Sequence, residues 1–173
     1  MRTHLGVVFQ EPILFSGDIY TNIALGMEGK GPVTEEDIKE IAKLTLCDTF
    51  IEKLPNQYHT SVGETGKLVS GGEKQRIALA RALIRQPTIL ILDEATSALD
   101  NESQKLFMEA LENWRRDHSC TVVTVAHRIS TIQNCDIIFY IKDGHVFASG
   151  THQQLMTRCS EYREMVLSQS MDQ

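Results

Sequence analysis

The sequence lacks any apolar run long enough to cross a membrane as a helix. The hydrophobic fraction is 42% over 173 residues, but no stretch approaches the roughly 18 apolar residues of a membrane span. The first residues, MRTHLGVVFQEP, also lack the long apolar region of a secretory signal. We therefore expect a folded domain that carries no membrane helix and no secretory signal.

The sequence has no cysteine pattern typical of a metal site. Cys47, Cys120, Cys135 and Cys159 are scattered, and no C-x₂-C spacing occurs. Structural zinc sites need such a spacing. We interpret the four cysteines as reduced thiols in a cytosol-like compartment.

Positive charge is not concentrated anywhere in the sequence. The 17 Lys and Arg residues are outnumbered by 23 Asp and Glu residues, and the net charge is −6. The absence of a basic stripe argues against nucleic acid as the main partner. The length predicts one domain with a sizeable core, and no internal repeat or low-complexity segment occurs.

One stretch, from Leu68 to Asp100, reads LVSGGEKQRIALARALIRQPTILILDEATSALD. Small residues at 70–72 precede a helix that we expect over Glu73 to Arg85, because good helix formers run there without Gly or Pro. A small-residue turn that leads into a helix N-terminus can bind an anion, since free N–H groups and the helix dipole act together. Pro87 ends the predicted helix.

A predicted strand and two acids follow. Ile89 to Leu92 are all apolar, which is typical of an interior strand of a parallel sheet, buried on both faces. Asp93 and Glu94 end this strand on its carboxyl side, where open α/β sheets bind ligands. Asp93 can hold Mg²⁺ through its waters, while Glu94 can orient or deprotonate an attacking water. Alone, ILILDE is equally consistent with a core strand that runs into a polar turn.

In combination, these motifs resemble the ATP-binding-cassette (ABC) ATPases. Residues 69–73 resemble the signature motif, Leu90 to Asp93 the Walker B strand, Glu94 the catalytic glutamate, and Ser97 to Asp100 the D-loop. The resemblance implies an α/β fold. This fold is a P-loop NTPase (ABC ATPase) core with a parallel sheet, plus an inserted all-helical subdomain.

Three further segments carry the same resemblance. Gln10, after a predicted strand at Leu5 to Phe9, resembles the Q-loop glutamine, which implies contact with Mg²⁺ and the water near the γ-phosphate. His127, after a predicted strand at Thr121 to Val125, resembles the H-switch, although a lone histidine there is more often structural. Residues 60–66 resemble the X-loop of ABC exporters, which meets the membrane domain.

The resemblance implies roles for particular residues, with ATP and Mg²⁺ as cofactors. Glu94 and His127 would be catalytic, and Asp93 and Gln10 would bind Mg²⁺, partly through water. At Glu73 the commonest signature has Gln, which we interpret as subtype variation. The residues implied in nucleotide binding are Gln10, Ser70, Gly71, Gly72, Glu73 and Asp100.

We interpret residues 1–173 as a partial ABC ATPase domain. It would comprise a Q-loop region at 1–33 and a helical subdomain with the signature motif at 34–86. The Walker B strand, D-loop, H-switch and C-terminal part would occupy 87–173.

No phosphate loop occurs in the sequence. The segment Gly63 to Lys67 hints at one, but G-x-x-x-x-G-K-[ST] needs Gly at Ser61 and Ser or Thr at Leu68. The resemblance places this loop and the N-terminal strands before Met1. We therefore expect a C-terminal fragment of an exporter domain, from a partial gene model, a truncated transcript or a split gene. We also expect Ile89 to Leu92 and Val122 to Val125 each to lack one neighbouring strand.

The implied function is an ATP-binding and ATP-hydrolysing domain that couples hydrolysis to transmembrane transport. Its partners would be a second nucleotide-binding domain, in a homo- or heterodimer, and a transmembrane domain upstream or on another chain. The domain would be membrane-associated through that partner, on the cytosolic or organelle-matrix side. Two alternatives stay open. One is a non-catalytic truncated subunit that donates only its signature face. The other is a chromosome-maintenance or repair ATPase head, for which the heptad coiled coil is not visible.

Overall fold

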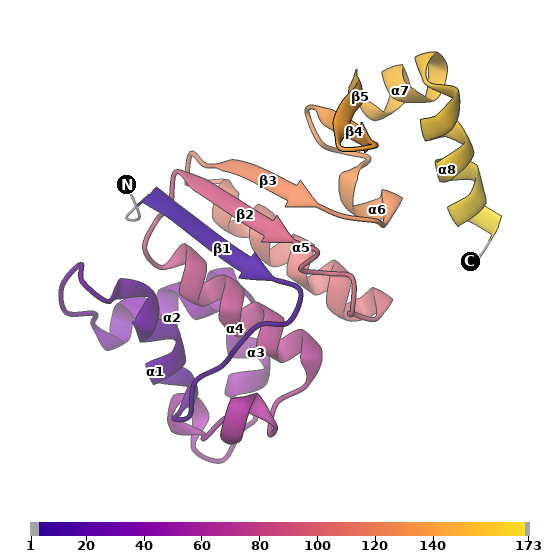
Figure 1. The fold of residues 1–173 in the computed structure, drawn as a ribbon. Coiled ribbons are helices and arrows are strands. Elements are labelled where there is room, and N and C mark those ends of the chain that lie inside the picture. Colours follow the sequence, from indigo (N-terminus) through magenta and orange to yellow (C-terminus); the bar gives the residue numbers. More distant parts are fainter. Residues whose placement is uncertain (1–3, 172–173) are drawn as a thin grey trace. The chain divides into compact units, whose positions relative to one another are not determined.

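The computed structural model describes residues 4–171 of the chain. These residues divide into two compact units, of which the first ends at Val125 and the second begins at Ala126 (Figure 1). Each unit has a hydrophobic core of its own.

A three-stranded parallel sheet forms the first unit's framework. Its strands are β1 (Leu5–Phe9), β2 (Ile89–Asp93) and β3 (Thr121–Val125), in the order β1-β2-β3. Leu5 pairs with Ile89, and Ile89 pairs with Thr121. The expectation of a missing neighbour is therefore wrong for β2, whereas β3, at the edge of the sheet, pairs with one strand among the described residues. β1 occupies one edge of β2 and β3 the other, so the backbone groups of the middle strand are paired on both sides.

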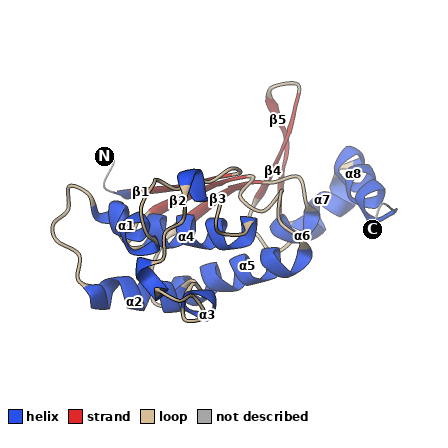
Figure 2. Cartoon of the chain, turned by 90° about the horizontal axis from the view of Figure 1, so that it is seen from below, coloured by secondary structure: helices blue, strands red, loops and turns tan. Residues whose placement is uncertain are grey.

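The sheet is covered on one face by helices of the same unit. Figure 2 shows α4 and α5 on one side of β1, β2 and β3. On that side Leu90 and Leu92 of β2 are buried, whereas Ile89, which points to the opposite side, is 43% exposed. The expectation of burial on both faces is thus wrong for the described residues, because side chains alternate across a strand and only one side meets a helix layer.

Helix α4 lies at the centre of the first unit's core. It is buried along most of its length, and Ile77, Leu79 and Leu83 are fully enclosed. The α-helices of this unit are α1 (Ile19–Ala24), α2 (Glu35–Leu44), α3 (Asp48–Ile51), α4 (Gly71–Leu83) and α5 (Asn101–Arg115). Short 3₁₀ turns are η2 (Leu25–Met27), η3 (Gln57–His59) and η4 (Glu64–Gly66).

Two of these helices begin with a capping box. Thr34 caps α2 together with Asp37, and Ser70 caps α4 together with Glu73. Each cap satisfies backbone N–H groups that have no partner inside the helix. Because Ser70 is the cap, α4 begins at Gly71, two residues before the predicted Glu73. It also ends two residues before the predicted Arg85, at Leu83.

The second unit packs two helices against a β-hairpin. Strands β4 (Ile138–Lys142) and β5 (His145–Gly150) pair antiparallel. Ile138, Leu155 and Tyr162 form part of its core. The helices of this unit are α6 (Ile129–Ile132), α7 (His152–Arg158) and α8 (Ser160–Met171).

Candidate functional site

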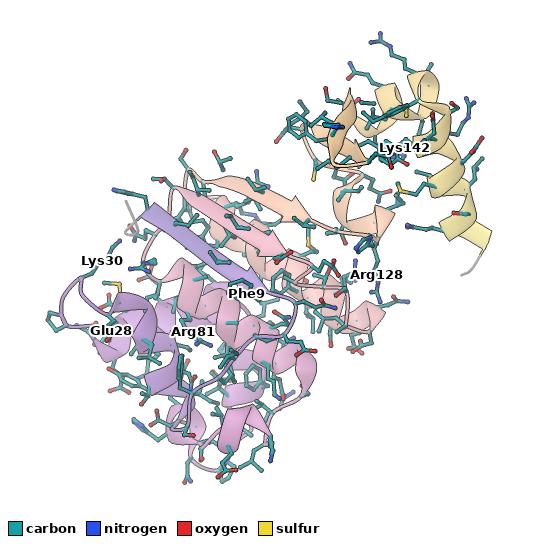
Figure 3. The ribbon with its side chains drawn as sticks, viewed as in Figure 1. Phe9, Glu28, Lys30, Arg81, Arg128 and Lys142 are labelled. Atoms are coloured by element: carbon teal, nitrogen blue, oxygen red, sulfur yellow. The ribbon has the colours of Figure 1, made fainter. Side chains whose placement is uncertain are left out.

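Polar side chains follow two adjacent strands where both strands end. Gln10 comes directly after β1, and Asp93 and Glu94 end β2. The strands are parallel, and Phe9 pairs with Asp93, so these ends lie at the same edge of the sheet. Figure 3 shows the labelled Phe9 at this end of β1. The structure thus brings Gln10 to the same edge as the two acids, at the place where such sheets bind ligands.

Glu94 is held in an unusual backbone conformation. Its φ is +48°, in the left-handed region that side-chain-bearing residues seldom adopt. Its backbone N–H donates to the Val125 carbonyl at 2.9 Å. Its carbonyl accepts from both the N–H and the Oγ of Ser97, each at 2.9 Å. Three hydrogen bonds therefore fix the backbone of this turn, and strained residues held in this way cluster at functional sites.

The turn before α4 presents the small residues of the signature segment. The Ser70 hydroxyl accepts from the Glu73 N–H at 3.3 Å, and Glu73 Oε2 accepts from the Ser70 N–H at 2.8 Å. Gly71 is exposed, and a β-carbon placed on it would meet no atom within 4 Å. Gly72 is buried. The open space at Gly71 allows a ligand to approach the N-terminus of a 13-residue helix.

Asp100 begins the helix that follows the D-loop segment. Its carboxylate accepts from the Ser103 N–H at 2.9 Å and from the Ser103 Oγ at 2.8 Å. These hydrogen bonds lower the pKa of Asp100 below its ordinary value. The side chain therefore has a structural role as the cap of α5 besides any contact with a ligand.

His127 lies in the second unit, just before α6. Its backbone carbonyl accepts from the side-chain amide of Gln169 at 2.6 Å, which ties the segment to α8. The role implied for its imidazole stays a prediction.

Sequence reasoning missed three polar side chains that hold the segment after Gln10. Gln75 of α4 donates to two carbonyls at the end of β1. Arg81, also on α4, donates to the Ile13 carbonyl at 2.8 Å. Asn22 of α1 accepts from the N–H of Phe15 at 2.8 Å and donates to its carbonyl at 2.9 Å. Gln75 could have been found from the sequence, because it is a polar residue four positions before Leu79, on the same buried face of the predicted helix.

The donor set at the sheet edge fits Mg²⁺ but not a metal held by protein ligands alone. Within the described residues, no cluster of three or more His, Cys, Asp or Glu side chains could hold an ion. A carboxylate and an amide oxygen are nevertheless the hard donors that Mg²⁺ accepts. This ion commonly takes one or two protein ligands and completes its shell with water and substrate phosphates.

The cysteines take no part in this site. All four are free, and burial raises the pKa of the Cys47 thiol to about 12. Such a thiol stays protonated and unreactive.

The segment that faintly resembles a phosphate loop has a different geometry. Residues Glu64–Gly66 make the single 3₁₀ turn η4, and the next helix starts only at Gly71. Ser61 forms an isolated bridge with Asp18 and not a strand. The geometry agrees with rejection of a phosphate loop here.

None of the helices described in the structure combines the length and the apolar character that crossing a membrane requires.

Comparison with known proteins places this architecture in one family. Residues 1–97 match the family described as ABC transporter. The chain is 47% identical over 173 residues to "Multidrug resistance protein 1" of Entamoeba histolytica, covering 100% of this chain and 13% of that protein. It is 49% identical over 166 residues to "ATP-binding cassette sub-family B member 5" of Mus musculus, covering 96% and 13%.

A solved structure gives the same result. The structure of a bacterial Atm1-family ABC exporter with ATP bound superposes with a TM-score of 0.87 at 38% identity, covering 97% of this chain and 28% of that one. The chain spans about an eighth of the length of the curated relatives it matches, 13% in both cases above. The family match, the relatives and the shared fold agree. The chain belongs to the ABC transporter family and has the sequence and fold of an exporter-type nucleotide-binding domain.

Proposed function

We propose that this domain binds ATP with Mg²⁺ and hydrolyses it to drive export across a membrane. The observation that carries the proposal is the shared carboxyl edge of β1 and β2, where Gln10 lies beside Asp93 and Glu94. Carboxylates and an amide at such an edge suit a nucleotide phosphate with its metal.

Each residue at this edge has a distinct role. Asp93 and the side-chain oxygen of Gln10 hold Mg²⁺, in part through water. When bound, Mg²⁺ neutralises charge on the phosphate oxygens. Glu94 accepts a proton from the attacking water, and three hydrogen bonds hold the backbone from which its side chain extends. The role that we assign to His127 is contact with the γ-phosphate.

The signature segment serves a second nucleotide. Ser70 and Gly71 lie at the open N-terminus of α4, where backbone N–H groups can approach an anion. Gly72 and Glu73 belong to the same first turn of α4, and Asp100 caps α5. In a head-to-tail pair of domains, this face binds the nucleotide held by the phosphate loop of the opposite domain.

A phosphate loop has to complete the site, and these 173 residues do not contain its motif. ATP hydrolysis is therefore measured on the complete transporter in which this domain works. That transporter includes the chain that supplies the phosphate loop. We call this the assembled transporter.

The contact with the membrane domain lies on two adjoining loops. Exposed apolar side chains occur at Ile13, Phe15 and Leu68. The loop that carries Leu68 runs beside the segment after Gln10, because the Val62 N–H donates to the Gly17 carbonyl at 3.0 Å. We assign this surface to the intracellular part of the transmembrane domain, which would hold the domain at the membrane on its cytosolic or organelle-matrix side.

A second candidate is a non-catalytic subunit that donates only its signature face. The fixed geometry of Glu94 favours the catalytic reading. Among the described residues, no observation favours a chromosome-maintenance ATPase head, and the solved structure named above is that of an ABC exporter.

Replacement of the proposed base tests the two candidates. In the assembled transporter, Glu94→Gln should retain ATP binding but lower turnover by about 100-fold, the usual scale for loss of a positioned base. Glu109→Gln makes the same chemical change at an exposed position of α5 and should leave turnover unchanged. Turnover of Glu94→Gln within a few-fold of the wild type would favour the non-catalytic subunit.

A further inference from the structure

One buried amide joins the signature helix to the turn that carries Gln10. Gln75 of α4 is only 2% exposed. Its Nε2 donates to the Gln10 carbonyl at 2.7 Å and to the Phe9 carbonyl at 3.1 Å. Both protons of the side-chain amide are thus used on two successive carbonyls, 65 and 66 residues away in the sequence.

The two carbonyls permit only one orientation of this amide. If the amide were flipped, Oε1 would face two carbonyl oxygens and no hydrogen bond could form. In the orientation found, Oε1 is buried and has no hydrogen-bond partner among the described residues. An unpaired buried acceptor is costly. Gln75 therefore keeps one unpaired acceptor while it supplies donors to two carbonyls, which points to a role for its two donated bonds.

The place of Gln75 on α4 suggests what that role is. It lies on the second turn of the helix that Ser70 caps, five residues after the cap. Its bonds end on the last residue of β1 and on Gln10 itself. A single side chain thus spans the distance between the signature turn, proposed to bind one nucleotide, and Gln10, proposed to bind the metal of the other.

We propose that Gln75 is a positioning residue that fixes the backbone of Gln10 relative to α4 and so sets where the Gln10 side chain meets Mg²⁺. This inference rests on the role proposed above for Gln10. It predicts that loss of the Gln75 amide raises the Mg²⁺ concentration needed for ATP hydrolysis. The cause would be a displaced Gln10, and not a general loss of stability.

Asn22 provides a matched control. It is also fully buried, and it holds the same segment farther along, at Phe15. Asn22→Ala should lower the melting temperature, because it leaves buried backbone groups unpaired. If Gln75 acts specifically on Gln10, Asn22→Ala should leave Gln10 in place.

The hydrogen bonds are tested first on the 173-residue chain. NMR spectroscopy should detect through-hydrogen-bond scalar couplings from Gln75 Nε2 to the carbonyl carbons of Phe9 and Gln10. This measurement needs no variant, so it stands even if a substitution prevents folding. Absence of both couplings in the folded chain would overturn the inference.

The functional test uses the assembled transporter and reads the Mg²⁺ concentration that gives half-maximal ATP hydrolysis. Gln75→Met, similar in size and unable to donate, should raise this concentration by about tenfold or more, the usual effect of losing a group that orients a metal ligand. Gln75→Glu places a carboxylate against two carbonyl oxygens and should raise it further. Asn22→Ala should leave it within about twofold, since the two sites do not share a partner.

A double substitution tests whether Gln75 affects the Mg²⁺ dependence through Gln10 or by another route. Gln10→Ala should itself raise the half-maximal Mg²⁺ concentration, and adding Gln75→Met should raise it no further. Additive effects, equal effects of Gln75→Met and Asn22→Ala, or no effect of Gln75→Met would each overturn the inference. If Gln10→Ala has no effect, the proposed role of Gln10 fails, and the functional part of the inference fails with it.

Discussion

Gly72 lies so close to Ser103 that no side chain fits between them. A β-carbon added to Gly72 would come within 2.5 Å of the Ser103 Oγ and 2.8 Å of its Cβ. Ser103 cannot retreat freely, because Asp100 holds both its N–H and its hydroxyl. The neighbouring Gly71 has open space on the same criterion. The two glycines of one motif thus differ: close packing requires glycine at position 72, whereas the space beside Gly71 is open.

This difference predicts opposite results for two alanine substitutions. Gly72→Ala should lower the free energy of unfolding by about 1–3 kcal/mol, the usual effect of overpacking. Gly71→Ala should leave stability unchanged or raise it by up to about 1 kcal/mol, because alanine favours helix. In the assembled transporter, Gly71→Ala should nevertheless reduce ATP hydrolysis, since the added methyl group occupies the space where a phosphate would approach.

Urea titration of the chain measures the stabilities, and steady-state hydrolysis measures the activity. If Gly71→Ala had full activity, the proposed approach of nucleotide at this turn would be wrong. If Gly72→Ala were as stable as the wild type, the close packing against Ser103 would be wrong.

The second prediction concerns the signature turn and the opposite domain. Ser70→Arg puts a bulky side chain at the N-terminus of α4, where backbone N–H groups are proposed to reach a phosphate. In an assembled transporter that pairs this variant with a wild-type domain, the nucleotide bound by the wild-type phosphate loop should be affected. Photo-crosslinking of a labelled ATP analogue, read separately for each domain, measures this. Damage confined to the variant's own phosphate-loop site would contradict the head-to-tail arrangement.

The third prediction concerns how the stability that Asp100 contributes, as the cap of α5, depends on pH. Hydrogen bonds from Ser103 lower the pKa of Asp100 in the folded chain. A carboxylate with a lowered folded-state pKa adds stability at pH values above its unfolded pKa, about 3.9 for Asp. This contribution is lost as the pH falls through the lower folded value.

Asp100→Asn keeps a side chain that can cap a helix but carries no charge. The wild type should therefore have the higher urea midpoint at pH 7 and at pH 5, and the difference should shrink only below about pH 4. Asp100→Ala, which removes the cap, should be less stable than Asp100→Asn at each pH. A wild-type advantage that grew toward low pH would contradict the assigned pKa direction.

The fourth prediction concerns the uncovered face of the sheet. Exposed apolar side chains there include Phe9, Ile89, Val123 and Val125. Contiguous apolar surface of this kind promotes association. The 173-residue chain alone should therefore self-associate, and the double substitution Val123→Thr with Val125→Thr should reduce this without loss of stability, because threonine keeps the shape and strand preference of valine.

Val122→Thr is the control. Val122 lies on the same strand but packs against the core, so its hydroxyl should lower stability by about 1–3 kcal/mol. Sedimentation velocity measures association and thermal melting measures stability. If the double variant associated as strongly as the wild type, the sheet face would not be the surface responsible.

The sequence by itself determined the local features of this protein. The small residues at 70–72 were recognisable as a turn that leads into a helix, because such turns depend on a few adjacent residues. The strands near Phe9, Asp93 and Val125 followed from short apolar runs. The motifs at 69–73 and 90–100 indicated the family, and the comparisons confirmed it.

Only the tertiary structure decided how these features meet. It placed β1 and β3 on either edge of β2, which corrected the expected missing neighbour. It also gave Glu94 its left-handed backbone, which depends on a carbonyl of β3.

The contacts of Gln75 and Gly72 illustrate the physical reason. The acceptors of Gln75 are backbone carbonyls, which every residue has, so the sequence carries no mark of the partner. The requirement for glycine at position 72 arises from Ser103, 31 positions later, whose approach depends on how α4 and α5 pack. Periodicity and capping are encoded over one or two helical turns, whereas these contacts depend on the packing of distant segments.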